Sequence, residues 1–249
     1  MPCYVASALV LGFSGVVNAA DISTVRPQKP FGISYSMDTQ QQDLRLSALA
    51  LSNPLLAPLV AAQGQIQTRS DIQSTGIKAD YWIAPHVNVF AAANKITGNV
   101  IVKFPSLPSF APLPDVTINA DGTTYNAGAT VVAGSDKLFG ALTYIHTTYT
   151  ADASGKTDTS QTLIPSVGRG LGDGTINLGL LYQKAEAHYA GQMNVPLLGS
   201  VTADVTAENK HNASWLVSYR THLGSETYLR TSAELGEREG IHLEVSKRF

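Results

Sequence analysis

Charged side chains of both signs recur at alternate positions in several segments of this chain, and they are the groups most able to do chemistry. Lys78 and Asp80 share one side of an alternating segment, and Arg230 and Glu234 share one side of another. The full set expected on this polar face is Lys78, Asp80, Arg220, Arg230, Glu234, Glu244 and Arg248. Charges inside a narrow protein must pair with one another or meet water. Two interpretations follow, an ion-pair network that fills the interior and a polar pathway for small solutes.

The histidines are the other side chains that could take part in catalysis, because a serine nucleophile needs an adjacent base. His211 lies three residues before Ser214, and in a strand this spacing puts the two side chains on opposite faces. The sequence also lacks metal-ligand spacing, a glycine-rich phosphate loop and a calcium-binding loop. We therefore expect no catalytic residue, no metal site and no cofactor.

Alternation of apolar and polar residues runs through most of the chain, and it predicts β-strands. In the last segment, Ile241, Leu243, Val245 and Phe249 share the apolar face. The strands expected on this basis are 31–37, 74–83, 86–96, 123–133, 137–150, 160–169, 175–184, 211–222, 227–236 and 240–249.

The connections between these strands alternate between short turns and mostly longer segments. We expect 97–122 and 190–210 to be long loops, and the first holds four prolines. Residues 40–70 are expected as a long first loop or a plug, in which two prolines limit any helix to a short one. A strand over 43–51 is the alternative, and it would raise the strand number to about twelve.

Composition indicates where such strands reside. Charged residues make up 14% of the chain and hydrophobic residues 44%, whereas a soluble domain carries about 25% charged residues. No stretch after the N-terminus has the roughly 18 apolar residues of a membrane helix. We therefore expect an all-β fold over residues 20–249, an antiparallel transmembrane β-barrel of about ten strands in a bacterial outer membrane, with about eight or about twelve as alternatives. A soluble periplasmic β protein is the competing interpretation.

The N-terminal residues have the pattern of a secretory signal peptide. Residues 4–17 are apolar, and small residues at Val17 and Ala19 suit cleavage after Ala19. We expect residues 1–19 to be removed, with a buried N-terminal helix as the alternative. The single cysteine, Cys3, lies in this segment, so the mature chain is expected to form no disulfide.

The last segment, LGEREGIHLEVSKRF, resembles the C-terminal insertion signal of outer-membrane proteins. The resemblance implies that Phe249 is read by the barrel-assembly machinery. Lys247 departs from the pattern, because an aromatic or apolar residue usually stands two positions before the end. At the membrane edge its ammonium group could reach the lipid headgroups.

A longer resemblance covers residues 68–249 and concerns a family of uncharacterised proteobacterial outer-membrane proteins. The similar pieces are GIKADYWIAPHVNVFAA, TYNAGATVVAG before DKLFGALTYIHTTYT, and the glycine-flanked ERE before the last strand. Pro165-Ser166 departs from it, where the family is expected to have Pro-Arg. The resemblance implies fold and location, and it implies no activity.

We therefore expect a small barrel without catalysis, either a narrow channel for small solutes or a structural or surface-interaction protein. The alternative is an outer-leaflet lipid-modifying or proteolytic barrel enzyme. The expected partners are outer-membrane lipids, the assembly machinery and small solutes. Nucleic acid is not expected, because the net charge is -2 and no basic stripe is present.

Overall fold

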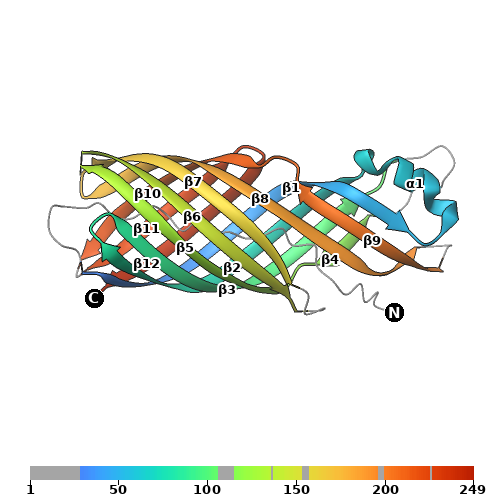
Figure 1. Ribbon diagram of the computed structural model, residues 1–249, viewed down its shortest axis with the longest axis horizontal. Helices are drawn as coiled ribbons and strands as arrows, with labels where there is room; N and C mark the ends of the chain where they lie inside the picture. The colour runs from blue at the N-terminus through green and yellow to red at the C-terminus, as the bar shows by residue number, and fades with distance from the viewer. Residues whose placement is uncertain (1–28, 106–114, 136, 153–156, 196–198, 225) are drawn as a thin grey trace.

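Ten antiparallel strands close into one barrel in the computed structural model, which describes residues 29–105, 115–135, 137–152, 157–195, 199–224 and 226–249 (Figure 1). The strands pair in the order β10, β11, β12, β1, β2, β3, β5, β6, β7 and β8, and pairing of β8 with β10 completes the ring. They are β1 (Phe31–Leu51), β2 (Gln67–Ala84), β3 (Val87–Lys103), β5 (Gly122–Ser135), β6 (Leu138–Ala151), β7 (Thr157–Leu171), β8 (Gly174–Val195), β10 (Ala213–Gly224), β11 (Thr227–Leu235) and β12 (Arg238–Arg248).

Side chains alternate between the outside and the inside of this barrel. On β1, Ile33 and Met37 are 43% and 50% exposed, whereas Ser34 between them is 2% exposed. The exposed apolar side chains include Tyr35, Ile77, Tyr81, Tyr125, Leu142, Tyr144, Leu163, Val167, Leu178, Tyr182, Trp215, Leu243 and Val245. We call this outer surface the apolar belt. A closed barrel leaves no sheet edge unpaired, and its apolar exterior suits lipid. The protein is therefore an outer-membrane β-barrel.

The two ends of the barrel differ. The short turns that join β2 to β3, β5 to β6, β7 to β8 and β10 to β11 lie at the end that also holds Phe249 (Figure 1). Gly134 and Gly224 have φ of 126° and 102° at these turns, a region of backbone space that glycine enters without steric cost. Because short turns are periplasmic in such barrels, the opposite end is extracellular.

An extracellular extension continues the wall beyond the apolar belt (Figure 1). It consists of the distal parts of β1, β2, β3 and β8 together with two added strands, β4 (Val116–Asn119) and β9 (Gly199–Asn209). β4 pairs with β3, and β9 lies between β8 and β1. Strand β1 pairs with β12 as far as Gln42 and with β9 from Leu44 onward. Strand β9 thus fills the wall above the short strands β10, β11 and β12.

The extension has a hydrophobic core of its own. Its tip is formed by η1 (Pro54–Leu56), α1 (Ala57–Ala61) and η2 (Gln63–Gln65), at the end of the molecule remote from the C-terminus (Figure 1). The buried core residues are Leu44, Leu46, Leu59, Ile66, Ile72, Ile96, Val100, Ile118, Ala120, Tyr149, Ala151, Ala185 and Ala207. No helix in the described part of the chain has the length and apolarity needed to cross a membrane.

The fold corrects three expectations about the connections. Residues 40–70 are neither a long loop nor a plug, because β1 continues to Leu51 and the short helices lie at the tip. The segment 97–122 contains the end of β3 and all of β4, and 190–210 contains the end of β8 and all of β9. The physical reason is the core of the extension, which gives these strands an apolar surface to pack on. The signal-peptide prediction for 1–19 lies outside the described residues.

Candidate functional site: the barrel interior and an extracellular cleft

One wall of the barrel interior carries the buried charges. The structure places all seven side chains of the predicted polar face inside, each at most 8% exposed. Lys78 and Asp80 lie on β2, Arg220 on β10, Arg230 and Glu234 on β11, and Glu244 and Arg248 on β12. Because β12, β1 and β2 are consecutive in the ring, these residues share one side of the barrel.

Glu244 lies at the centre of this charged wall. Its Oε2 accepts a hydrogen bond from Lys78 Nζ at 2.5 Å, and its Oε1 lies 3.4 Å from Arg230 NH1. His242 Nε2 stands 3.9 Å from the same carboxylate. Two cationic groups, Arg230 on the adjacent strand β11 and Lys78 on β2 beyond β1, therefore compensate one buried carboxylate, which offsets the cost of removing these charges from water.

A second ion pair closes the periplasmic end of the wall. Arg248 NH2 donates to Asp80 Oδ2 at 2.5 Å, and Asn88 Nδ2 donates to the same oxygen at 2.9 Å. Arg248 NH1 also donates to the backbone oxygen of Pro30 at 3.3 Å. Gly32 makes room for this pair, because a Cβ at that position would lie 2.5 Å from Asp80 Oδ1. The last strand is thus tied to β1 and β2 through its penultimate residue.

Three further buried ionisable side chains, Arg238, Asp38 and His242, join the network, and none of them is among the seven predicted residues. Arg238 Nε lies 2.5 Å from Glu234 Oε2, its Nη2 donates to Glu234 Oε1 at 3.4 Å, and its Nη1 donates to Gln183. Asp38 pairs with His242 Nδ1 and accepts from Ser74 Oγ at 2.9 Å. Asp38 follows the strand predicted over 31–37 by one residue, so extending the alternation would have found it. Arg238 falls between the strands predicted over 227–236 and 240–249, so the alternation did not include it.

The opposite wall of the interior is uncharged. Among the described residues, β3, β5, β6, β7 and β8 contribute no buried charged side chain. They supply hydroxyl and amide groups such as Thr130 and Thr143, whose oxygens lie 2.9 Å apart. Five apolar side chains from β3, β6, β7, β8 and β10 form one cluster: Phe90, Ile145, Ile164, Leu181 and Leu216. These strands follow one another around the ring except for β5, where Gly128 leaves room for the Phe90 ring, so the cluster lines this side of the lumen.

The described part of the interior is densely filled by side chains. Inward side chains on both walls are nearly inaccessible to solvent. Within the described ranges, no group of three or more histidine, cysteine, aspartate or glutamate side chains could hold a metal ion. Arg220, one of the seven predicted residues, stacks its guanidinium 3.8 Å from the centroid of the Tyr228 ring, a cation–π contact.

A cleft of about 760 Å³ opens on the extracellular extension. It lies where β1 and β2 separate, because their pairing ends at Leu44 and Thr68. The turn η2 covers the gap, and Ile101 of β3 and Lys210 line the cleft as well. Its volume is in the range of small-molecule sites, about 300–1,000 Å³. Sequence reasoning did not anticipate this cleft, because it depends on where two strands part.

Comparison with known proteins gives similarity of structure alone. No known family profile matches the chain, and no curated protein matches its sequence. An outer-membrane channel from Pseudomonas putida F1 is 11% identical with a TM-score of 0.43, over 94% of this chain and 100% of that one. The β domain of the Bordetella autotransporter Brka is 10% identical with a TM-score of 0.44, over 89% of this chain and 100% of that one.

The translocator domain of the autotransporter NalP from Neisseria meningitidis is similar to the same degree. It is 12% identical with a TM-score of 0.42, over 90% of each chain. These identities and TM-scores are low, so the fold is assigned from the strand pairing described above. The functions of these proteins are not assigned to this chain.

Proposed function

We propose that this protein is a non-catalytic outer-membrane barrel that acts at the cell surface through its extracellular extension, in a structural or binding role. The closed interior is the observation that carries the proposal. The charged wall is compensated internally around Glu244, and inward apolar side chains of the opposite wall, such as Ile145 and Leu181, are at most 1% exposed. The extension, in contrast, has its own core and a cleft that opens to the outside.

A solute-flux experiment tests this proposal. The full chain would be refolded into liposomes, and swelling would be followed after dilution into small sugars and amino acids. The proposal predicts rates equal to those of liposomes without protein. Swelling that grows with the amount of protein would overturn it, because a side-chain-filled barrel of about ten strands leaves no wide aqueous path.

A narrow, gated channel for small solutes is the second candidate, and the one-sided distribution of charge favours it. An ion moving along the charged wall would have to pass the Glu244 carboxylate, which is paired with Lys78 and Arg230. Replacing Glu244 with Gln removes that interaction. The channel candidate predicts higher flux for Glu244→Gln than for the wild type, whereas the surface role predicts no flux from either protein.

An outer-leaflet lipid-modifying or proteolytic enzyme is the alternative from a different class. Asp38 and His242 form a buried pair, but both lie inside the barrel at 6% and 4% exposure. Incubation of the refolded protein with lipopolysaccharide and phospholipids is expected to leave their mass spectra unchanged. A new product peak that depends on the protein would show catalysis.

Three assignments from the sequence extend this proposal. The chain would belong to the family of uncharacterised proteobacterial outer-membrane proteins that residues 68–249 resemble. Phe249 would serve as the assembly signal read by the barrel-assembly machinery, and residues 1–19 would be removed during export. Outer-membrane lipids would surround the apolar belt, and small solutes remain partners of the channel candidate. Mass spectrometry of the mature N-terminus tests the cleavage after Ala19.

A further inference from the structure

The cleft on the extracellular extension is lined by more positive than negative side chains. Arg45, Arg69, Lys103 and Lys210 line it, and Asp43 is the single carboxylate among the lining residues. Asp43 Oδ2 lies 3.8 Å from Lys210 Nζ, and Arg45 pairs with Glu208 at 2.8 Å, which leaves Arg69 and Lys103 without a carboxylate partner among the described residues. The cleft therefore favours a ligand that carries negative charge.

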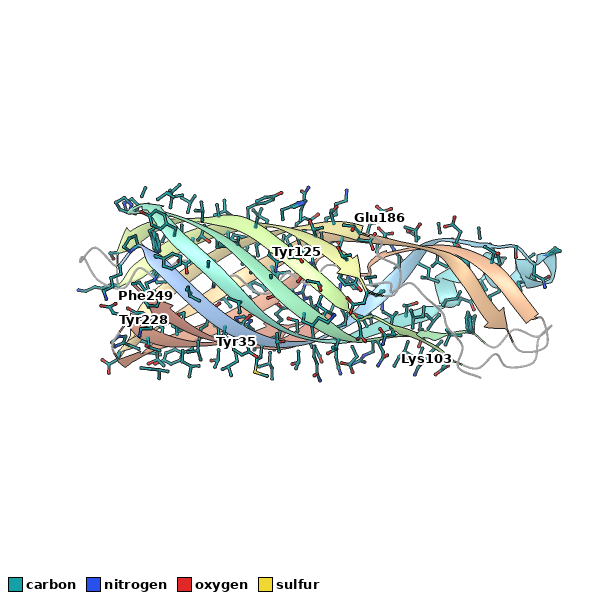
Figure 2. All side chains as sticks on the ribbon, turned by 90° about the horizontal axis from the view of Figure 1, so that it is seen from below. Tyr35, Lys103, Tyr125, Glu186, Tyr228 and Phe249 are labelled. Carbon is teal, nitrogen blue, oxygen red and sulfur yellow. The ribbon has the colours of Figure 1, made fainter. Side chains whose placement is uncertain are left out.

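Two of these cations stand side by side without a carboxylate partner. Arg69 of β2 is the cross-strand partner of Ile101, and Lys103 of β3 is the partner of Gln67. Arg69 and Lys103 are thus diagonal neighbours on one face, within reach of one anionic group. In the described part of the chain, Arg69 donates to the Gln41 amide oxygen, and no ion pair is formed by either cation. Figure 2 shows Lys103 toward the extension, beyond the part of the barrel where Tyr35 lies.

The rest of the lining suits a sugar. Gln63, Gln65 and Gln67 line the cleft together with Thr68. A glutamine amide both donates and accepts, so it can bind the adjacent hydroxyl groups of a saccharide. Ile101 adds a small apolar surface for the C–H face of a sugar ring. Fatty-acid sites differ, because they need a deep apolar channel for the chain.

The height of the cleft above the membrane points to the same class of ligand. Met37 is the last large exposed apolar side chain of β1, and Arg45 follows it by eight residues. At about 3.3 Å per residue and a strand tilt of about 40°, Arg45 stands about 20 Å above the apolar belt. The acyl chains of the outer leaflet do not reach this height, whereas the phosphorylated sugars of its glycolipid do.

We propose that this cleft binds a phosphorylated saccharide, the inner sugar region of the lipopolysaccharide that surrounds the barrel. Arg69 and Lys103 hold a phosphate group through charge-assisted hydrogen bonds. The glutamine amides of η2 and β2 bind the neighbouring hydroxyl groups. This site deepens the proposed surface role, and it is tested separately from the closed interior, which the solute-flux experiment addresses.

The test measures binding of a defined probe to the full chain refolded in detergent. The probe is deacylated lipopolysaccharide, which keeps the phosphorylated inner sugars and loses the acyl chains, titrated by isothermal calorimetry at low salt. We expect saturable binding, and about a tenfold or greater loss of affinity for the double variant Arg69→Gln, Lys103→Gln. Phosphatase-treated probe should bind the wild type as weakly as the intact probe binds the double variant.

Lys95→Gln provides the matched control, because Lys95 is an exposed lysine of the same strand that lies outside the cleft and pairs with Asp152. This variant should bind like the wild type. Heat-modifiable mobility on a gel verifies that each variant is folded. Equal affinity of the wild type and the double variant would overturn the proposal. Undiminished binding of the phosphatase-treated probe, or binding of dodecanoate in place of the saccharide, would overturn it as well.

Discussion

Lys78 Nζ lies 2.5 Å from Glu244 Oε2, although 166 residues separate them in the sequence and strand β1 lies between their strands. The bond crosses over β1 on the inside of the barrel and joins the second strand to the last. The Glu244 carboxylate lies within reach of Lys78 only when β12 pairs with β1 and the ring is closed. The closure of the barrel and the neutralisation of its interior are therefore coupled.

Replacing Lys78 with Met should destabilise the barrel by about 3 kcal/mol, because Glu244 would keep Arg230 alone as its close cationic partner. Adding Glu244→Gln should restore part of the loss, since no buried carboxylate then lacks compensation. Urea unfolding in lipid vesicles measures both effects. Lys95→Met, which changes an exposed lysine, is the control and should alter stability by less than about 0.5 kcal/mol. Additive losses in the double variant would argue against the pairing.

Gly32→Ala should weaken the link between the two ends of the chain. The added Cβ would lie 2.5 Å from Asp80 Oδ1 and 3.3 Å from Arg248 Cζ, so the ion pair must move. We expect a loss of about 1–3 kcal/mol, typical of overpacking. Gly64→Ala is the matched control, because nothing lies within 4 Å of a Cβ there. Equal unfolding midpoints for the two variants would contradict the described contact.

Phe90→Ala should cost about 3–5 kcal/mol, the usual price of removing a buried aromatic ring. Phe90 belongs to the buried apolar cluster of the uncharged wall, and Gly128 leaves the space that its ring occupies. Val89→Ala is the control, since Val89 is the preceding residue and points to the opposite face. If both substitutions lowered the unfolding free energy by the same amount, the apolar cluster would not be the packed core that we describe.

Tyr149→Phe should destabilise the base of the extension by about 1 kcal/mol. The Tyr149 hydroxyl donates to the backbone oxygens of Ala120 at 3.3 Å and Asp121 at 3.1 Å, which hold the segment after β4 against β6. Hydrogen exchange of the amides near Asp121 would report the local loosening. Tyr144→Phe, on the exposed face of the same strand, should leave that exchange unchanged.

The membrane-spanning part of the fold follows from the sequence, and the extension does not. Within the apolar belt, one face meets lipid and the other meets packed polar groups, so residues such as Ile77 and Lys78 alternate visibly. Above the belt the outer face meets water. Gln40, Gln41 and Gln42 therefore show no alternation although β1 continues through them. Strand β9 does alternate, with Val205 and Ala207 on one face and Thr206 and Glu208 on the other, so the expectation of a long loop over 190–210 overlooked a visible pattern.

The partners of the buried charges could not be predicted either. The alternation of apolar and polar residues along a strand indicates which face a side chain takes. The charged partner of that side chain depends on the register between neighbouring strands. On β1, Ser34 is paired with Lys78 of β2, and Ser36, two residues along the same inner face, is paired with Glu244 of β12. This register brings Lys78 within reach of Glu244. The cleft depends on the residue at which β1 and β2 part, which no local pattern marks.

Single-molecule conductance in planar lipid bilayers tests the central claim most directly, because it measures whether the interior is closed. The refolded wild-type barrel would be inserted at 1 M potassium chloride, a condition that amplifies any ion path, and insertion would be verified by protease protection. We expect a current equal to that of the bare bilayer over many insertions. Discrete and stable open steps from the wild-type protein would contradict it and would favour the gated channel.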